Sequence, residues 1–539
     1  MSIHCAECPP VLHTAQSTSP ARETTTDNIS TDLEHTGVMD MSEDCHPDIT
    51  HTTDCSSTVS ALKLRIRTLQ RQLREKDKQL SSVTENLKFL QPDQIRSLKY
   101  SRSSKNKGIT WSTATLKSAF ELRYSCGVKG YNVLRETGYP LPSYRTLCRR
   151  IQHATFVPGI QSDTFQWLTT KCAAMKEQEK DCALMLDEMQ IKRALEFDRS
   201  INRYIGSISP EVGGPDDEPV LSDHALVFML RGMTSNWKQV VAYFFTGSSV
   251  QGGLLWGLVK QVVIDAAAAG LCVRAVVSDM GSSNQAMWRA AGVHANRSGV
   301  VCSVTHPCQQ LVHDQPDANM FTPPHLYFLA DVPHLLKNIR NCVMTQDIIL
   351  PPEVLRQHNL PSPKVQMQHI AAVVELQNES ELKIAPSLTN RHIEPGQYQK
   401  MRVSTAAQVL SHSTASALRY CVETAQLPQD ALTTAWFVDF VNSWFDLMNG
   451  RSYENSLRCT AVCQSKFSVL EDMTNLARQM MFAGKRSSWK PIQTGILMST
   501  YSVLQLYEDL VVSHRYRYLL AGRLTQDSLE NFFSQVHVT

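Results

Sequence analysis

The stretch from Cys182 to Gln190, which reads CALMLDEMQ, limits the possible folds of this chain more than any other. Its unbroken apolar run from Cys182 to Leu186 has the length of a β-strand that is buried on both faces, as in the sheets of α/β proteins. The run ends at Asp187 and Glu188. Because burying a carboxylate is costly without a cation or a hydrogen-bond donor, we expect one of these near this strand end.

A second stretch, Val273 to Asp279 (VRAVVSD), has the same design and is followed at once by MGSSN. Open α/β sheets bind ligands at the carboxyl ends of their strands, so Asp187 and Asp279 would lie side by side if the two strands are neighbours. Two close carboxylates repel each other, and a divalent cation relieves that repulsion. The two strands therefore predict one shared metal site.

Length, charge and cysteine content limit the class of protein. A chain of 539 residues should contain two or more domains. The formal net charge is only +2, so any nucleic-acid-binding surface must be local. The 15 cysteines are scattered, which favours reduced thiols in a cytosolic or nuclear protein over a secreted disulfide framework. No apolar run is long enough to span a bilayer, so we expect no membrane partner.

Two segments precede the first expected domain. Residues 1–58 are rich in Ser, Thr, Asp and His and contain no aromatic residue, which predicts a disordered tail. In 59–90, apolar residues recur alternately three and four positions apart, with Lys76 as a charged interruption. This heptad pattern predicts a parallel coiled coil that joins two copies of the chain, or more; the alternative is an amphipathic helix packed on its own domain. The heptad residues are Val59, Leu62, Ile66, Leu69, Leu73, Leu80, Val83, Leu87 and Leu90.

Residues 91–155 carry a compact helical pattern. One helix opens at Trp111 and stops near Gly127, a second stops at Gly138, and a third is expected from Tyr144 to His153. Short helices that end in an arginine-rich one are typical of a helix-turn-helix domain whose last helix enters the DNA major groove; a plain helical linker is the alternative. The basic residues of 99–107 would hold phosphates or act as a nuclear-import signal. The expected DNA-binding residues are Arg145, Arg149 and Arg150.

The α/β body is expected from residue 180 to 345. Further strands are predicted at Asn202–Ile208, Ala225–Leu230 and Leu326–Asp331, whereas Val240–Phe245 fits either a strand or a buried turn of helix. An antiparallel meander followed by parallel strands and helices, with acids after the first and fourth strands, is the layout of a ribonuclease-H-like α/β fold. That fold needs one more acid, from a helix near the end.

Glu530 is the candidate for this last acid. In QDSLENFF the apolar residues Leu529, Phe532 and Phe533 share one helical face, and Glu530 lies on another. Asp331 is a rival third ligand, although its place just before a helix indicates capping.

Four blocks together resemble the P element transposases and their vertebrate relatives that carry a THAP domain. They are LMLDEM, VVSDMGSSN, DVPHLLKNIRN and QDSLENFFS, and the resemblance runs from about Phe89 to the end, including GYPLPSYRTLCRRI. It implies a catalytic core in two parts, 180–345 and 523–539, separated by an all-α insertion at 346–522. It also implies a DDE triad of Asp187, Asp279 and Glu530 that holds two Mg²⁺ (or Mn²⁺) ions and cleaves and joins DNA at transposon ends and target sites.

In this family the insertion binds GTP without a P-loop, and no P-loop is present here. Where the family has a lysine before Leu-Thr, this chain has Ser387. Where the family has a lysine before the position of Val403, this chain has Arg402. The resemblance places the guanosine contacts at Val403, Ser411, Phe445, Asp446, Asn449 and Asp527.

Three functions remain open at this point. The first is a nuclear, P-element-like cut-and-paste DNA transposase, truncated or captured by its host. The second is a catalytically inactive, dimeric DNA-binding protein derived from a transposase. A ribonuclease-H-type nuclease unrelated to transposition is third. The family's zinc-binding THAP domain is not visible in the sequence, and Thr539 follows soon after Glu530, so we expect reduced targeting beside a nearly complete catalytic core.

Overall fold

The computed structural model describes most of the chain apart from its amino-terminal residues and several loops. The predicted tail of 1–58 lies almost wholly outside the described residues, which begin at 54. The described residues form two compact units, a smaller one within 54–116 and 134–142 and a larger one that contains 117–133 and 143–538. The described ranges are 54–86, 89–100, 109–151, 156–199, 201–213, 220–309, 323–379, 381, 383–460, 463–484, 489–513 and 516–538.

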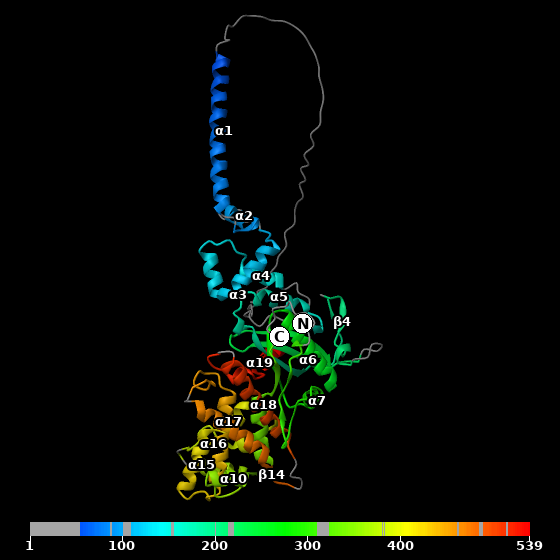
Figure 1. Cartoon of the computed structure of the whole chain (residues 1–539), viewed down its shortest axis with the longest axis vertical. Coiled ribbons are helices and arrows are strands. Elements are labelled where there is room, and N and C mark those ends of the chain that lie inside the picture. The colour runs from blue at the N-terminus through cyan, green and yellow to red at the C-terminus, as the bar shows by residue number, and fades with distance from the viewer. Residues whose placement is uncertain are drawn as a thin grey trace, which may run out of the picture. The chain divides into compact units, whose positions relative to one another are not determined.

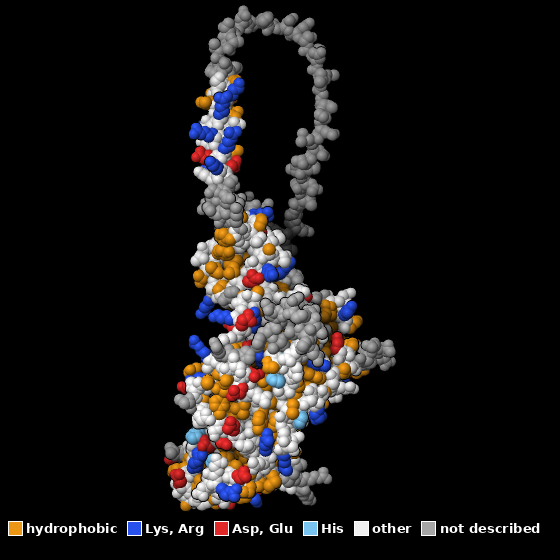
Figure 2. All heavy atoms as spheres, in the orientation of Figure 1, with side chains coloured by type: hydrophobic (Ala, Val, Ile, Leu, Met, Phe, Trp, Pro, Cys, Tyr) orange, Lys and Arg blue, Asp and Glu red, His pale blue; other side chains and the backbone are white. Residues whose placement is uncertain are grey.

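The smaller unit contains a long helix, α1 (Asp54–Asn86), and a short one, α2 (Pro92–Tyr100). Helix α1 overlaps the predicted coiled-coil helix of 59–90 but begins earlier and ends sooner. Within residues 58–79 of α1 the large apolar side chains are exposed in the single chain, and basic side chains lie between them (Figure 2). Pairing of α1 with a second copy stays a prediction. The exposed apolar residues include Val59, Leu62, Ile66, Leu69 and Leu73.

Buried polar side chains tie α2 to the segment that follows it. The carboxylate of Asp93 accepts hydrogen bonds from the backbone N–H of Ser112 at 2.7 Å and from Thr115 Oγ1 at 2.8 Å. Ser112 Oγ accepts from the backbone N–H of Thr115 at 3.2 Å, so Ser112 caps the next helix. Gln94 Nε2 donates to the carbonyl of Pro140 at 2.9 Å.

The predicted helical block at 91–155 has helices where the sequence indicates them. Helix α3 (Thr113–Glu136) is interrupted at Gly127, whose positive φ of 69° is accessible to glycine at little cost. Helix α4 (Tyr144–Ile151) follows. On α4 Arg145, Arg149 and Arg150 are exposed while Leu147 is buried. The helices are therefore confirmed, and their helix-turn-helix role stays a prediction.

The larger unit is built on a seven-stranded mixed sheet in the order β1-β6-β5-β2-β7-β11-β10. Strands β6, β5 and β2 pair antiparallel, while β2, β7 and β11 pair parallel, as the sequence predicts for a meander followed by parallel strands. The central strands are almost completely buried. The bounds are β1 (Gly159–Ile160), β2 (Asp181–Gln190), β5 (His224–Gly232), β6 (Lys238–Thr246), β7 (Cys272–Ser278), β10 (Ser303–Thr305) and β11 (His325–Ala330).

One predicted strand is present but is shorter than expected and belongs to another sheet. The segment Asn202–Ile208 does not join the main sheet, because β4 (Arg203–Ile205) pairs with β3 (Glu196–Asp198) in a separate hairpin. The exposed rings of Phe197 and Tyr204 pack edge to face across that hairpin, 5.2 Å apart. The third strand of the meander is instead β6, which resolves the ambiguity at Val240–Phe245 in favour of a strand.

Helices cover the sheet and bring the end of the chain back onto it (Figure 1). Helix α18 packs closely on β11, since Ser499 Oγ donates to the carbonyl of Ala330 at 2.8 Å and Ser502 Oγ to that of Phe328 at 2.6 Å. None of the described helices has both the length and the apolar character that a bilayer crossing demands. The helices are α5 (Ser162–Cys172), α6 (Gly252–Ala268), α7 (Ser282–Ala290), α9 (Val332–Thr345), α18 (Pro491–Tyr507) and α19 (Asp527–Val538).

Between α9 and α18 lies the predicted helical insertion, whose helices α15, α16 and α17 gather at one end of the larger unit (Figure 1). The sequence of Gly396–Thr424 on its own indicates one continuous helix, but the structure has three. Arg402 and Ser411 each begin a new helix, and Ser411 Oγ accepts from the backbone N–H of Thr414. The bounds are β12 (Ile348–Ile349), α10 (Pro352–Gln357), β13 (Lys364–Val365), α11 (Met367–Asn378), α12 (Asn390–Ile393), α13 (Gln397–Lys400), α14 (Val403–Val409), α15 (His412–Glu423), α16 (Ala431–Met448), α17 (Gln464–Gln479) and β14 (Met481–Phe482).

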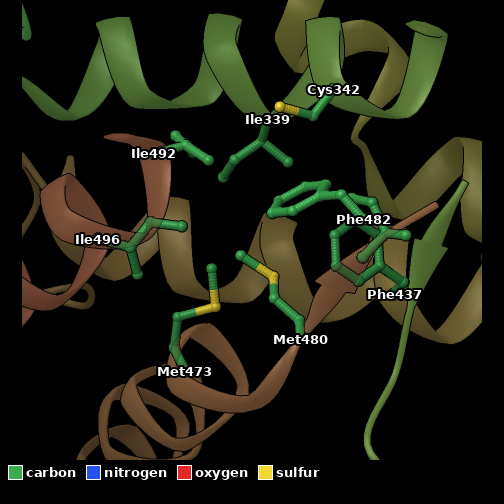
Figure 3. A pocket seen from close by; sticks show the side chains of 9 residues that line it. Ile339, Cys342, Phe437, Met473, Met480, Phe482, Ile492 and Ile496 are labelled. Carbon is green, nitrogen blue, oxygen red and sulfur yellow. The ribbon is translucent and has the colours of Figure 1, made fainter. Parts of the chain in front are cut away.

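The insertion shares its core with α9 and α18 around a small apolar cavity of about 10 Å³ (Figure 3). A cavity of this size is at the lower limit for one water molecule and offers it no polar partners, so we expect it to be dry. The lining residues are Ile339, Cys342, Ile348, Phe437, Met473, Met480, Phe482, Ile492 and Ile496.

Replacing Phe437 by alanine is expected to reduce the free energy of unfolding by about 3–5 kcal/mol, because the lost ring enlarges this dry cavity. Urea denaturation of the whole chain measures the effect. The control is Met401→Ala, since the Met401 side chain is 71% exposed and its truncation should change stability by less than about 0.5 kcal/mol. Equal midpoints for the two variants would contradict the packing described here.

Candidate functional site

Three aspartates lie where the parallel pairing of neighbouring strands ends. Met185 of β2 is the register partner of Val277 in β7, and Ser278 is the partner of Ala330 in β11. Asp187, Asp279 and Asp331 therefore come to the same edge of the sheet. Strand β2 itself continues to Gln190 through its antiparallel pairing with β5, so Asp187 lies where its parallel pairing has ended. The predicted neighbourhood of Asp187 and Asp279 is confirmed by this register.

The last helix is attached to the same edge by the fully buried Gln526. Its backbone N–H donates to Asp331 Oδ1 at 2.7 Å, and its side-chain Nε2 donates to the carbonyl of Leu186 at 2.6 Å. Leu186 directly precedes Asp187 although it lies 340 residues from Gln526 along the chain. Helix α19 thus begins beside the acids, with Glu530 in its first turn. Leu529 is fully buried, as its helical position predicts.

Asp331 has a structural task. Its Oδ2 accepts from the backbone N–H of His334 at 3.0 Å and from His334 Nδ1 at 2.7 Å, while Oδ1 accepts from Gln526. The residue is fully buried and is the N-cap of α9. Asp331 therefore caps α9, as its sequence position indicates, and its rival role as a third metal ligand stays a prediction.

Among the three predicted catalytic acids, Asp279 and Glu530 both act electrostatically on Asp187. Burial and the charge of Asp279 raise the pKa of Asp187 to about 7, with a further contribution from Glu530 and an opposing one from His334. His334 Nδ1 lies 3.7 Å from Glu530 Oε1. Asp279 Oδ1 accepts hydrogen bonds from the backbone N–H of Gly281 at 2.8 Å and from Asn284 Nδ2 at 2.6 Å. The acids therefore face one region whose negative charge is only partly compensated.

The chemistry of this region fits a divalent cation. Carboxylate oxygens are the preferred ligands of Mg²⁺ and suit Mn²⁺, and a cation would relieve the repulsion between Asp187 and Asp279 that raises the pKa of Asp187. Across the described ranges, however, no three His, Cys, Asp or Glu side chains already converge closely enough to hold an ion. Asp187, Asp279 and Glu530 would have to move closer together, and their role as metal ligands stays a prediction.

The residues predicted to contact guanosine are only partly gathered. Arg451 pairs with Asp527 and also reaches Asn449 Oδ1 at 3.5 Å, so it links the end of α16 to the start of α19. Asp446 accepts from Asn442 Nδ2 within α16, at 2.9 Å, and burial raises its pKa. The other three lie on the insertion, with Val403 at the start of α14, Ser411 as the cap of α15, and Phe445 in α16.

Several residues of the site escape a reading of the sequence. For His334 the sequence does carry a signal. It stands three positions after the predicted cap Asp331, and the residue at that position commonly hydrogen-bonds to the capping residue. Asn284 lies in the MGSSN block that follows Asp279 but carried no assigned role. Gln526 and Arg451 gave no local signal, since their partners are distant in sequence.

Comparisons with known proteins agree with this architecture. The family model "TNP-like, RNase H N-terminal domain" matches residues 156–292, and "TNP-like, GTP-binding insertion domain" matches 333–459. The core is thus a ribonuclease-H-like mixed sheet with a helical insertion of the GTP-binding type.

Two relatives and one solved structure extend the match. The Transposable element P transposase of Drosophila melanogaster is 26% identical over 416 residues, covering 77% of this chain and 49% of that protein. DNA transposase THAP9 of Homo sapiens is 24% identical over 437 residues, covering 77% and 44%. The Drosophila P element transposase strand transfer complex superposes with a TM-score of 0.59 at 25% identity, over 85% of this chain and 92% of that one. The chain spans about half the length of the curated relatives it matches.

Proposed function

The chain belongs to the family of P element transposases and THAP9, and we propose that it cleaves and joins DNA strands in cut-and-paste transposition. One observation carries this proposal: segments far apart in the sequence bring Asp187, Asp279 and Glu530 to one edge of the sheet, where burial and the charges of Asp279 and Glu530 raise the pKa of Asp187. The test is Mg²⁺- or Mn²⁺-dependent nicking and joining of DNA oligonucleotides that carry transposon ends.

The residues divide the work as follows. Asp187, Asp279 and Glu530 would hold a pair of divalent cations, which supply charge stabilisation at the attacking and leaving oxygens of a phosphodiester. Asn284 and the Gly281 N–H fix the Asp279 carboxylate through its Oδ1. Gln526 holds the start of α19, and hence Glu530, against the end of β2. His334 places a hydrogen-bonding ring between Asp331 and Glu530.

Asp187 makes the stability of the metal-free protein depend on pH. Its folded pKa of about 7 lies above the ordinary value of 3.8, so the folded state holds the proton more tightly than the unfolded state between these pH values. Its contribution to stability is therefore present below about pH 4 and is lost as pH rises towards 7. We expect Asp187→Asn to be more stable than the wild type by roughly 2–4 kcal/mol at pH 8, and by little at pH 4. Urea titrations in EDTA measure this, and an equal difference at both pH values would contradict it.

We also propose that the insertion binds GTP and that α1 joins two copies of the chain in a nuclear protein. The match to a GTP-binding insertion domain supports the first statement, and the exposed heptad residues of α1 support the second. Fluorescent GTP analogues and imaging of a fluorescent fusion test nucleotide binding and nuclear location. A chain that does not bind GTP, or that is not nuclear, would reject that proposal alone and would not bear on DNA cleavage.

Leu69→Lys is expected to convert a dimer into a monomer, because Leu69 is a heptad seam residue that is exposed in the single chain. Thr68→Lys adds the same charge one position off the seam and should leave the dimer intact. Sedimentation equilibrium of the whole chain distinguishes the two. A wild-type monomer, or a dimer that survives Leu69→Lys, would remove α1 from the assembly.

A second candidate function is a non-catalytic DNA-binding dimer derived from a transposase. It is favoured by one observation, namely that within the described residues no three potential metal ligands already converge. Specific DNA affinity without nicking across Mg²⁺, Mn²⁺ and several substrates would support this second function.

A further inference from the structure

Four basic side chains gather where the β5–β6 hairpin meets the segment that leads into α19. Arg231 and Lys238 are direct register partners on β5 and β6. Arg523 Nη1 donates to the carbonyls of Ser235 at 2.7 Å and Gly232 at 3.4 Å, which brings its guanidinium to the turn of the same hairpin. Like charges on directly opposed strand residues destabilise a sheet, so this arrangement needs a reason.

Arg451 is the fourth member, and with Arg231, Lys238 and Arg523 it forms what we name the basic cluster. Its side chain passes over Gly522, where an added Cβ would lie 2.9 Å from Arg451 Cγ. It then pairs with Asp527 while its side chain remains 60% exposed. The absence of a side chain at Gly522 lets the insertion place Arg451 next to Arg523.

The described part of the chain balances the charges of the basic cluster only in part. Among the described residues the cluster has one ion pair, between Arg451 and Asp527. The Nη1 atom of Arg231 is buried and finds no hydrogen-bond acceptor in the same described ranges. Burial and the charge of Arg523, with that of Arg451, lower the pKa of Arg231 to about 10. Burial and the charge of Arg231 likewise lower the pKa of Lys238. A bound anion from outside the chain would offset the repulsion between these cations and supply a hydrogen-bond acceptor for Arg231.

We propose that the basic cluster binds phosphate groups and holds them one helical turn from the catalytic acids. Asp527, the acid paired with Arg451, precedes Glu530 by three positions in α19, so both lie on neighbouring parts of one helical face. Guanidinium groups suit phosphate because their planar forks donate two parallel hydrogen bonds. The inference rests on the proposed function and adds to it a surface outside α4 and outside the acids.

Phosphates can reach the basic cluster from two sources. A DNA strand entering the site would supply its backbone. A bound GTP would supply its triphosphate, because Arg451 touches Asn449 and Asp527, two of the residues predicted to contact guanosine. The shared chemistry is the phosphate oxygen, and the experiment separates the sources.

The test compares the double variant Lys238→Gln/Arg451→Gln with the matched control Lys260→Gln/Arg356→Gln, which removes two exposed cations from α6 and α10. Binding to labelled duplex DNA is measured by fluorescence anisotropy in EDTA between 50 and 200 mM salt. Each phosphate contact contributes about 0.9 to the slope of log affinity against log salt concentration, so two lost contacts reduce this slope by about 1.8. Between 50 and 200 mM salt, the affinity of the double variant should therefore fall roughly twelvefold less than that of the wild type. A fluorescent GTP analogue forms the second arm. Lys238→Gln alone is measured as well, in case the double variant does not fold.

A reduced salt slope in the double variant alone supports the proposal with DNA as the source. A loss of GTP affinity alone, of about tenfold, supports it with the nucleotide as the source. Slopes and GTP affinities equal to those of the control variant overturn it, as does a wild type that binds neither DNA nor GTP at 50 mM salt. Binding is measured without metal, so it is independent of DNA cleavage. A chain that binds through the basic cluster but does not nick DNA would reject only the proposed function. A chain that nicks DNA but does not bind through the basic cluster would reject only the phosphate-binding proposal.

Discussion

Replacing Asp187 by asparagine is expected to lower the rate of DNA nicking by on the order of 10²–10³-fold or more, while DNA affinity stays within about twofold of the wild type. The amide cannot supply the anionic oxygens that a divalent cation needs, although it fits the same space. Because burial and Asp279 raise the pKa of the Asp187 carboxyl, its loss also removes a folded-state repulsion, so the variant should fold at least as well as the wild type.

Nicking of a labelled transposon-end oligonucleotide in Mn²⁺ measures this loss, together with anisotropy for DNA binding. The control is Glu188→Gln, which removes the adjacent carboxylate on β2; successive strand side chains point to opposite faces, so activity should fall less than tenfold. Nicking by Asp187→Asn at the wild-type rate would reject the assignment of this acid.

Replacing Asp331 by alanine should reduce the free energy of unfolding by roughly 3–5 kcal/mol, the largest stability loss that we expect for an acid in this chain. The change removes the cap of α9 and leaves the buried Gln526 N–H without its acceptor. It also releases His334 and the start of α19. Asp331→Asn retains an oxygen that can cap α9 and should lose clearly less.

Urea denaturation in EDTA compares these variants with Asp163→Ala, which removes an exposed acid from the first turn of α5. That control should change stability by about 0.5 kcal/mol or less. A loss below about 1 kcal/mol for Asp331→Ala would show that the bonds to Gln526 and His334 do not hold the site together.

The strand ends of the site were predictable because they rest on local pattern. The apolar runs before Asp187 and Asp279 have the length of buried strands, and the structure pairs them in parallel register. The break of α3 at Gly127 was equally local, since glycine tolerates the positive φ found there.

Other elements depended on contacts that a sequence does not display. Strand β6 is richer in apolar residues than Asn202–Ile208, but the sequence does not display which strand each segment pairs with. In the structure β6 enters the main sheet, while β4 pairs with β3 in a separate hairpin. The sequence of the insertion helices α14 and α15 indicates one helix, because the capping role of Ser411 becomes visible only in its bond to the Thr414 N–H.

The attachment of Glu530 to the core shows the same limit. Its helix was predicted from Leu529, Phe532 and Phe533, but the bonds that fix it, from Gln526 to Leu186 and Asp331, cross most of the chain. Arg451 was missed for the same reason, because its partner Asp527 lies in another part of the fold.

The most direct test of the shared acid site is a crystal structure of the chain with transposon-end DNA and Mn²⁺, in which anomalous scattering locates the ions. We expect two manganese peaks about 3.5–4 Å apart, each in contact with carboxylate oxygens from among Asp187, Asp279 and Glu530. Manganese bound elsewhere, or carboxyl carbons of these acids that remain more than about 10 Å apart with DNA in place, would contradict it.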